Sequence, residues 1–284
     1  MNESVNDIVQ EIQSNYDIVG REQELKKVVI AHLAGQHALI EGSVGVGKTT
    51  LAKAVASHFN KDFLRVDGDE RFTETKMTGV FDPPLVVKEG WTWNSFVPGP
   101  LTEAMQTGAI LFINEANRLP EGTQNVLLPA LDERQIIIPK LGVVNGKNGF
   151  QIIATQNPEE FIGTTSLCEA LRDRFVFIGL DFQDEEEERR IVKLQSQCED
   201  EDTIKKVVAI VRTTRGYADL RRGSSVRGAI DLANIIRFYD SPTYEDWVSS
   251  AIMALATKIE LEDGLEKSVE EVIREIVGYV LGDF

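Results

Sequence analysis

Residues 42–50 constrain the fold of this chain more than any other stretch, because their sequence, GSVGVGKTT, fits the phosphate-binding loop pattern G-x-x-x-x-G-K-[ST] at every fixed position. The glycines of such a loop let backbone N–H groups turn inward around phosphate oxygens. Lys48 would then supply a positive charge to the β- and γ-phosphates, and Thr49 would offer its hydroxyl to Mg²⁺. We therefore expect a nucleoside triphosphate to bind at Gly42, Ser43, Val44, Gly45, Val46, Gly47, Lys48, Thr49 and Thr50.

The residues on either side of the loop have the composition that this pattern requires. A short apolar run at residues 38–40 suits a buried parallel strand, and the sequence of residues 51–56 favours a helix. Strand, loop and helix thus occur in the required order. The alternative is a glycine-rich surface turn that matches the pattern by chance.

The composition is that of an ordinary globular protein, with 284 residues, 42% of them hydrophobic and 27% charged. No apolar run approaches the roughly 18 residues of a membrane span, and residues 1–4 lack the features of a signal peptide, so we expect a cytoplasmic protein without membrane contact. A formal charge of −16 argues against extended contact with nucleic acid.

The cysteines and histidines indicate no metal centre. Cys168 and Cys198 fit neither a disulfide framework nor a metal-ligand spacing, so we expect two free thiols. The histidines are scattered, and we expect them to be structural or surface residues: His32, His37 and His58.

Apolar runs of strand length predict a parallel sheet of five strands near residues 38–40, 63–67, 109–113, 150–155 and 175–178. Two of these strands end in polar residues, and ligands of open α/β sheets collect beyond the carboxyl ends of the strands. Glu115 would orient the water that attacks the γ-phosphate, and Asn157 would bind that water or the γ-phosphate. The alternatives are that Glu115 caps the next helix and that Asn157 forms a turn before Pro158.

Two hairpins are also predicted. Residues 85–93 alternate on both sides of a turn at 88–90, which would place Trp91 and Trp93 on one face, where packing against their own sheet is favoured over a contact surface. Residues 135–138 and 142–146 predict a second, projecting hairpin, after a helix over residues 121–133.

The C-terminal hundred residues show helical patterns at 204–212, 226–238, 247–259 and 269–280, and no convincing strand. The acids at 184–188 suit the solvated first turn of another helix. We expect an α/β domain over residues 1–183, followed by a small all-helical lid domain over residues 184–284.

Several motifs in fixed order resemble the AAA+ ATPases, and specifically their MoxR branch, over nearly the whole chain. The phosphate loop matches Walker A, and residues 110–118 are similar to the Walker B block, which in this branch usually reads Asp-Glu-Ile-Asn-Arg. Residues 99–101 and the expected hairpin around Trp91 resemble a MoxR hallmark and the helix-2 insertion of this clade. The remaining resemblances are Asn157 to sensor 1, Arg174 to the arginine finger, Arg227 to sensor 2, and Val19 and Gly20 to the segment that contacts adenine.

The resemblance implies a homo-oligomeric ring, commonly a hexamer, that binds ATP and Mg²⁺ between subunits. Lys48, Thr49, Glu115 and Asn157 would act from one side, while Arg174 and, in this clade, Arg227 would act on a neighbour's nucleotide. It also implies chaperone-like remodelling of a client protein, or cofactor or metal insertion into it, often beside a partner with a von Willebrand factor A domain.

Three positions depart from the family pattern. Asn114 stands in place of the usual Asp, and Ser43 and Val226 replace common prolines. An amide oxygen can accept a hydrogen bond from a Mg²⁺-bound water, but we expect a loss of about one to two kcal/mol in metal affinity relative to a carboxylate. An ATP-binding switch or scaffold with weak hydrolysis is therefore the main alternative function. A DNA-directed motor is a third, which the acidic charge disfavours.

Overall fold

The computed structural model describes residues 4–158 and 167–282. Residues 1–3, on which the expectation of no signal peptide partly rests, lie outside this description. The chain divides into two compact units, one of residues 1–43 and 47–181, the other of residues 182–284 with residues 44–46. Each unit has its own hydrophobic core.

The first unit is built on the predicted five-stranded parallel sheet, in the order β2-β5-β8-β1-β9. All five predicted strands are therefore confirmed, and with them the α/β fold class. Their bounds are β1 (Ala38–Glu41), β2 (Phe63–Asp67), β5 (Ile110–Asn114), β8 (Gln151–Gln156) and β9 (Val176–Gly179).

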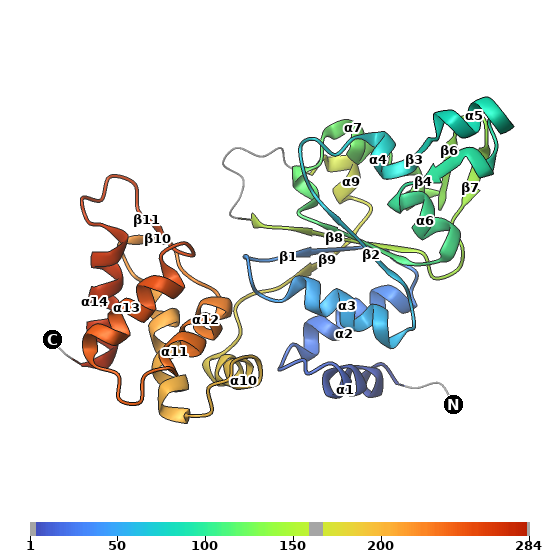
Figure 1. Cartoon of the computed structure of the whole chain (residues 1–284). Helices are drawn as coiled ribbons and strands as arrows, with labels where there is room; N and C mark the ends of the chain where they lie inside the picture. Colours follow the sequence, from blue (N-terminus) through green and yellow to red (C-terminus); the bar gives the residue numbers. More distant parts are fainter. Residues whose placement is uncertain (1–3, 159–166, 283–284) are drawn as a thin grey trace. The chain divides into compact units, whose positions relative to one another are not determined.

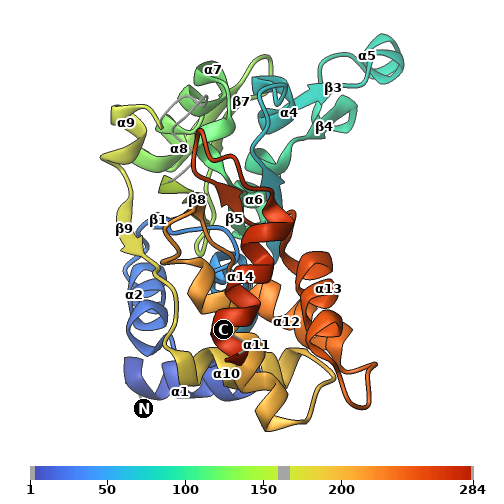
Figure 2. The same ribbon diagram turned by 90° about the vertical axis from the view of Figure 1, so that its left-hand side faces the viewer.

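Helices lie on both faces of this sheet (Figure 1). On one side are α1 (Val5–Asn15), α2 (Glu22–Leu33) and α3 (Lys48–His58), and on the other are α6 (Pro100–Thr107), α7 (Glu121–Asn125) and α9 (Glu169–Arg172). Helix α8 (Leu128–Asp132) lies beside α7 (Figure 2). The cluster of buried side chains in this unit includes Leu111 and Ile113 of β5 with Leu101 and Met105 of α6. Because both faces are covered, the central strands carry consecutive apolar residues rather than alternate ones, at 38–40 in β1, 110–113 in β5 and 152–154 in β8.

The hairpin predicted for residues 85–93 is wrong. Residues 83–89 form helix α5 (Pro83–Glu89), followed by the 3-10 helix η1 (Trp93–Ser95). The reason lies just before the alternating stretch: the Asp82 carboxylate accepts a hydrogen bond from the Leu85 N–H at 3.2 Å and two prolines occupy the first helical positions, a strong helix start.

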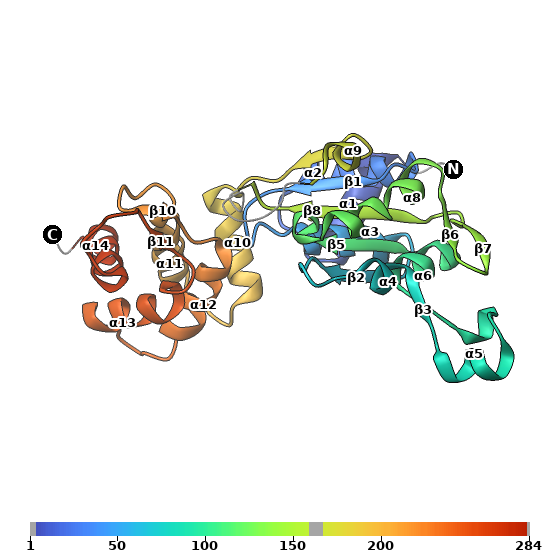
Figure 3. The ribbon, with the colours of Figure 1, turned by 90° about the horizontal axis from the view of Figure 1, so that it is seen from above.

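A short antiparallel ribbon, β3 (Gly79–Phe81) with β4 (Phe96–Pro98), carries this inserted segment and follows helix α4 (Glu74–Thr78). Figures 1 and 3 show α5 held away from the sheet by the ribbon. Trp91 packs edge-on against Phe81 at 4.7 Å between ring centroids, and Trp93 packs against Phe96 at 5.6 Å. The prediction that both tryptophans share one face of a strand is wrong, since neither lies in a strand, but each indole packs on the ribbon and remains about half exposed, at 54% and 44%.

The second predicted hairpin is confirmed as β6 (Gln135–Ile138) paired antiparallel with β7 (Gly142–Asn145). The helix predicted over residues 121–133 is instead two short helices, α7 and α8. Pro129 has no N–H to donate to the carbonyl four residues earlier, which interrupts a continuous helix at this point. The short helix η2 (Ala116–Arg118) follows β5 directly.

The described part of the second unit contains five helices, whose buried side chains form its core. Figure 2 shows α11 to α14 gathered together. Their bounds are α10 (Glu185–Gln195), α11 (Glu201–Thr214), α12 (Val226–Ile236), α13 (Tyr244–Leu255) and α14 (Val269–Leu281). Of the described helices in either unit, none combines the length and the apolar character needed to cross a membrane.

The prediction of an all-helical C-terminal domain is wrong in one detail. A short antiparallel pair, β10 (Leu220–Arg222) with β11 (Glu260–Leu261), lies among the helices. Strands of two and three residues are too short to show a period in the sequence. The Glu260 carboxylate joins them through oxygen–nitrogen distances of 2.8 Å to both Arg221 and Arg222.

The acidic run at residues 184–188 starts α10, as predicted, with the Asp184 carboxylate accepting from the Glu187 N–H at 2.8 Å. The prediction that the whole run is solvated is wrong for Glu188, which is 2% exposed. Its two carboxylate oxygens lie 3.1 Å from an Arg212 nitrogen and 2.7 Å from an Arg215 nitrogen. This buried ion pair joins α10 to α11 and to the residue that follows α11.

Candidate nucleotide-binding site

The phosphate-loop residues connect β1 to α3, so the expected order of strand, loop and helix is present. Gly45 and Gly47 have φ angles of +84° and +98°, a region that residues with a Cβ rarely occupy. Lys48 is the first residue of α3, and its Nζ donates hydrogen bonds to the carbonyl oxygens of Gly42 and Ser43, the latter at 3.0 Å. The N-terminus of α3 adds the positive end of a helix dipole, which favours bound phosphate.

The polar residues at the strand ends are brought to the same edge of the sheet as this loop. β8 lies between β5 and β1, and Glu41 is in register with Gln156. Asn157 directly follows β8 and is 2% exposed, while Thr49 is half-buried and Thr50 is exposed in the first turn of α3. Asn157 therefore stands, in strand order, between the phosphate loop and the end of β5.

Glu115 follows β5 in a left-handed conformation, with φ +53°. Such a conformation costs a non-glycine residue about 1 to 2 kcal/mol, and residues held in it gather at functional sites. The Glu115 N–H donates to Thr155 Oγ1 at 3.0 Å, and the carboxylate lies 2.9 Å from a guanidinium nitrogen of Arg118. Although Glu115 precedes η2, its carboxylate makes no capping bond to that helix in the described structure. The capping role considered from the sequence is therefore not what fixes this side chain.

The Asn114 side chain is held at both ends of its amide. Its Nδ2 donates to Asp67 Oδ1 at 3.0 Å, and its Oδ1 accepts from the Thr155 hydroxyl at 3.2 Å. An Arg65 nitrogen lies 2.6 Å from Asp67 Oδ1, and this contact, with the Asn114 bond, holds the pKa of Asp67 below its usual value. Sequence reasoning missed Asp67 and Thr155. The signal for Asp67 was present, since it is the last polar residue of a predicted strand that ends at the same edge.

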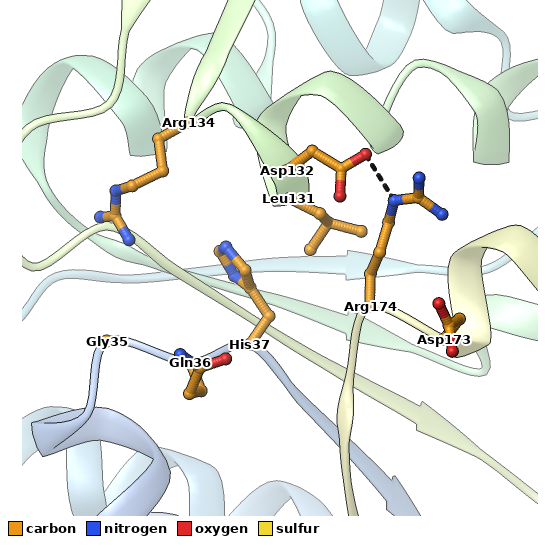
Figure 4. Close-up of a pocket in the computed structure, with 8 residues that line it drawn as sticks. All are labelled: Gly35, Gln36, His37, Leu131, Asp132, Arg134, Asp173 and Arg174. Atoms are coloured by element: carbon orange, nitrogen blue, oxygen red, sulfur yellow. Dashed lines mark ion pairs between the residues drawn. The ribbon is translucent and has the colours of Figure 1, made fainter.

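Arg174 lies elsewhere in the first unit. It comes two residues before β9, whose first residue pairs with Ala38 at the start of β1, whereas the phosphate loop follows the end of β1. The four residues of β1 separate its start, near Arg174, from the phosphate loop after its end by ~13 Å along the strand. Arg174 lines a pocket of about 470 Å³, and its Nε lies 2.6 Å from Asp132 Oδ2. Figure 4 shows this ion pair among the residues that line the pocket. The structure therefore does not bring Arg174 to the phosphate loop of its own chain.

The other predicted contact residues lie in two places. Val19 is buried in the turn before α2, and the carbonyl oxygen of Gly20 accepts a hydrogen bond from Gln13 Nε2 at 2.6 Å. Arg227 lies in the first turn of α12, in the second unit, with an exposed side chain.

His37 and His32 make hydrogen bonds within the first unit and have structural roles. His37 Nδ1 accepts a hydrogen bond from the Ile152 N–H at 2.8 Å, and burial, reinforced by the charge of Arg134, lowers the pKa of His37 to about 4. His32 Nδ1 lies 2.8 Å from Gln151 Oε1. In the part of the chain that the structure describes, His, Cys, Asp and Glu side chains form no group of three suited to a metal ion. Cys168 and Cys198 are both free, as predicted.

The fold and the loop together define a P-loop nucleotide-binding α/β protein, and comparison with known proteins agrees. Residues 37–175 match the family model described as an AAA domain of the dynein-related subfamily. The uncharacterised protein YojN of Bacillus subtilis strain 168 is 31% identical over 239 residues, which are 80% of this chain and 77% of YojN. The chain belongs to the AAA+ ATPase family.

Solved structures share this fold. A proposed ATPase from Cytophaga hutchinsonii is 22% identical with a TM-score of 0.53, over 96% of this chain and 94% of its own. A RuvB variant from Thermotoga maritima is 19% identical with a TM-score of 0.57, over 94% and 84%. NtrX from Brucella abortus, crystallised with ADP, is 18% identical with a TM-score of 0.56, over 83% and 54%. At these identities the likeness extends to the fold alone.

Proposed function

We propose that this protein binds ATP with Mg²⁺ and hydrolyses it between neighbouring subunits of a homo-oligomeric ring. The observation that carries the proposal is the common edge of the sheet at which the phosphate loop, Glu115 and Asn157 all lie. In this proposal Lys48 and the loop N–H groups hold the phosphates, Glu115 orients the attacking water and Asn157 binds that water or the γ-phosphate.

The residues at this edge fit a Mg²⁺ ion bound largely by phosphate and water. Mg²⁺ in such sites keeps several waters and takes few protein ligands, so a group of three carboxylates is not required. The Thr49 hydroxyl, in the first turn of α3, would bind the ion directly, and the Asn114 amide oxygen would accept from one of its waters. The ion would neutralise charge on the β- and γ-phosphates.

The position of Arg174 supports a site shared between subunits. Because Arg174 starts at the opposite end of β1 from the phosphate loop, it would serve the nucleotide of a neighbouring copy of the chain rather than its own. An arginine supplied in this way raises the rate of phosphoryl transfer by about 10³ to 10⁵. We assign Arg227 a similar role toward a neighbour's nucleotide, and Val19 and Gly20 a role beside the adenine.

We further propose a MoxR-type role for this ATPase, in which a cytoplasmic hexamer acts on protein rather than on nucleic acid. It would remodel a client protein, or insert a cofactor or metal into it, with a von Willebrand factor A domain protein as partner. The order of the motifs supports this, with residues 1–183 as the core and residues 184–284 as the lid. The segment inserted between β3 and β4 also supports the proposal, and we assign it to the helix-2 insertion of this branch.

The proposed binding site is tested by Lys48→Ala, which we expect to abolish tight binding of a fluorescent ATP analogue. Lys53→Ala is the matched control, since Lys53 is an exposed lysine of the same helix. Micromolar affinity retained by Lys48→Ala would contradict the assignment of the site.

The proposed catalytic roles are tested by steady-state hydrolysis. Glu115→Gln should bind ATP and turn over very little, and near-wild-type turnover would rule out its role toward water. Mixing Arg174→Ala chains with Glu115→Gln chains should restore part of the activity, because some interfaces would then combine an intact Glu115 with an intact Arg174. Verified mixed rings without any recovery would contradict a role between subunits.

A second candidate, an ATP-binding switch or scaffold with slow hydrolysis, is favoured by the pairing of Glu115 with Arg118 at 2.9 Å. In that arrangement the carboxylate is held by a neighbour instead of a water. Arg118→Ala distinguishes the two: it should raise turnover if the ion pair restrains Glu115, and leave it unchanged if the pair opens freely.

A further inference from the structure

We propose that Asp67, at the end of β2, supplies the negative charge that the Walker B position of this chain lacks, so that Asp67 and Asn114 act together toward the nucleotide-bound Mg²⁺. The inference rests on the proposed ATPase function and names a positioning residue for it. In the family pattern the carboxylate sits at position 114 itself; here the carboxylate is one strand away, on a residue that contacts Asn114 directly.

The sheet places these two residues side by side. β2 and β5 are adjacent parallel strands, and Asp67 and Asn114 are partners in their register. Register partners on adjacent strands project to the same face, and both residues end their strands at the edge where the phosphate loop lies. The hydrogen bond of 3.0 Å from Asn114 Nδ2 to Asp67 Oδ1 joins the two side chains.

The bond to Asp67 also fixes which end of the Asn114 amide is the acceptor. A rotated amide would set its oxygen against the Asp67 carboxylate, which accepts but cannot donate when ionised. With Nδ2 toward Asp67, Oδ1 accepts from Thr155 at 3.2 Å. A carbonyl oxygen has two lone pairs, so one remains for a metal-bound water. Asp67 thus acts in two ways, by orienting the amide and by placing beside it a carboxylate charge that Asp67 shares with the Arg65 guanidinium at 2.6 Å.

The pair predicts an outcome opposite to that expected from the motif alone. Restoring the family residue with Asn114→Asp would place two carboxylates at the 3.0 Å now spanned by a hydrogen bond. Like charges at this distance repel, so the single substitution should not improve Mg²⁺ binding. Exchanging the two residues, with Asp67→Asn and Asn114→Asp in one chain, would restore one carboxylate and one amide in contact.

The experiment compares the wild type, Asp67→Asn, Asn114→Asp and the exchanged double variant. The affinity for a fluorescent ATP analogue is measured in EDTA and in excess Mg²⁺, and their ratio is the Mg²⁺ gain. We expect Asp67→Asn to lower the gain about tenfold, which is the loss of one charge-assisted hydrogen bond, with little change in EDTA. Asn114→Asp should not exceed the wild type, and the double variant should recover most of the gain. Asp62→Asn, an exposed acid just before the other end of β2, is the control.

The outcomes separate the two proposals. If the wild type binds no nucleotide in either buffer, the proposed function fails and this inference fails with it. If the wild type binds with a Mg²⁺ gain that Asp67→Asn leaves intact, or that Asn114→Asp raises, the inference alone is overturned, and Asp67 is only a surface partner of Arg65. Thermal unfolding of the four proteins without nucleotide supplies a second readout, in which Asn114→Asp should lower Tm and added Asp67→Asn should recover it.

Discussion

Acid should destabilise the first unit through His37, which is 5% exposed at the start of β1 (Figure 4). Burial, together with the charge of Arg134, lowers the pKa of this imidazole to about 4, against about 6.5 for an exposed histidine. The unfolded chain therefore binds a proton before the folded chain does as pH falls. The contribution of His37 to the free energy of unfolding is therefore fully present above about pH 6.5. It decreases as pH falls from 6.5 to 4, and below pH 4 the free energy no longer changes with the protonation of this group.

The size of the effect follows from the width of this window. Each pH unit inside it costs about 1.4 kcal/mol, so His37 accounts for about 3 kcal/mol in all and about 2 kcal/mol between pH 7 and pH 5. Carboxylates also titrate below pH 5. The comparison is therefore best made between pH 7 and pH 5, against a variant that lacks only this imidazole.

The matched variant is His37→Asn, because the amide oxygen of asparagine can replace Nδ1 as acceptor for the Ile152 N–H. Stability is measured by urea-dependent hydrogen exchange of peptides covering β1 and β8, which reports on the unit that contains His37. We expect the wild type to lose about 2 kcal/mol more than the variant between pH 7 and pH 5. Parallel losses in the two proteins would refute the assignment of a buried neutral imidazole.

Two further predictions concern stability and the site. Glu188→Ala should destabilise the second unit by about 3 kcal/mol, because it leaves two arginines without their buried partner. The control, Glu186→Ala at an exposed position, should change stability little. Equal shifts of the two variants in thermal unfolding would contradict this prediction. Gly68→Ala should cost about 1 to 3 kcal/mol and impair hydrolysis, because an added Cβ would lie 2.0 Å from the Glu115 carbonyl oxygen. Gly216→Ala, with nothing within 4 Å, is its control in the same assays.

The sheet was predictable because its signals are local and strong. The run at 110–113 is apolar at every position, as a strand covered on both faces must be, and Lys48 falls in a pattern that specifies both the turn and the next helix. The segment at 85–93 was mispredicted because an apolar run as short as residues 85–87 does not distinguish a strand from a helix. Asp82 and the two prolines decided between them, and they lie outside the alternating stretch.

The environment of Glu188 was not predictable in the same way. The acids at 184–188 look alike in sequence, and the helix dipole favours an acid anywhere in this first turn. Only one faces inward, and its partner Arg212 lies 24 residues further along the chain. Burial of a charge depends on which side chains the fold brings to it, which a local pattern does not contain.

Asn114 shows the same limit at the site itself, with a consequence for function. When position 114 is considered alone, asparagine in place of the usual aspartate removes a carboxylate and predicts weaker binding of Mg²⁺. Its partner in the fold, Asp67, stands 47 residues earlier in the sequence and in register on the next strand. In a parallel sheet, the last residues of neighbouring strands lie at the same edge and can contribute to one site. A carboxylate can therefore stand at the end of either strand, and the site has the same total charge. The effect of a departure from a motif at a strand end therefore depends on the last residues of the strands beside it. The exchange of Asp67 and Asn114 measures this dependence directly, as the Mg²⁺ gain in nucleotide affinity.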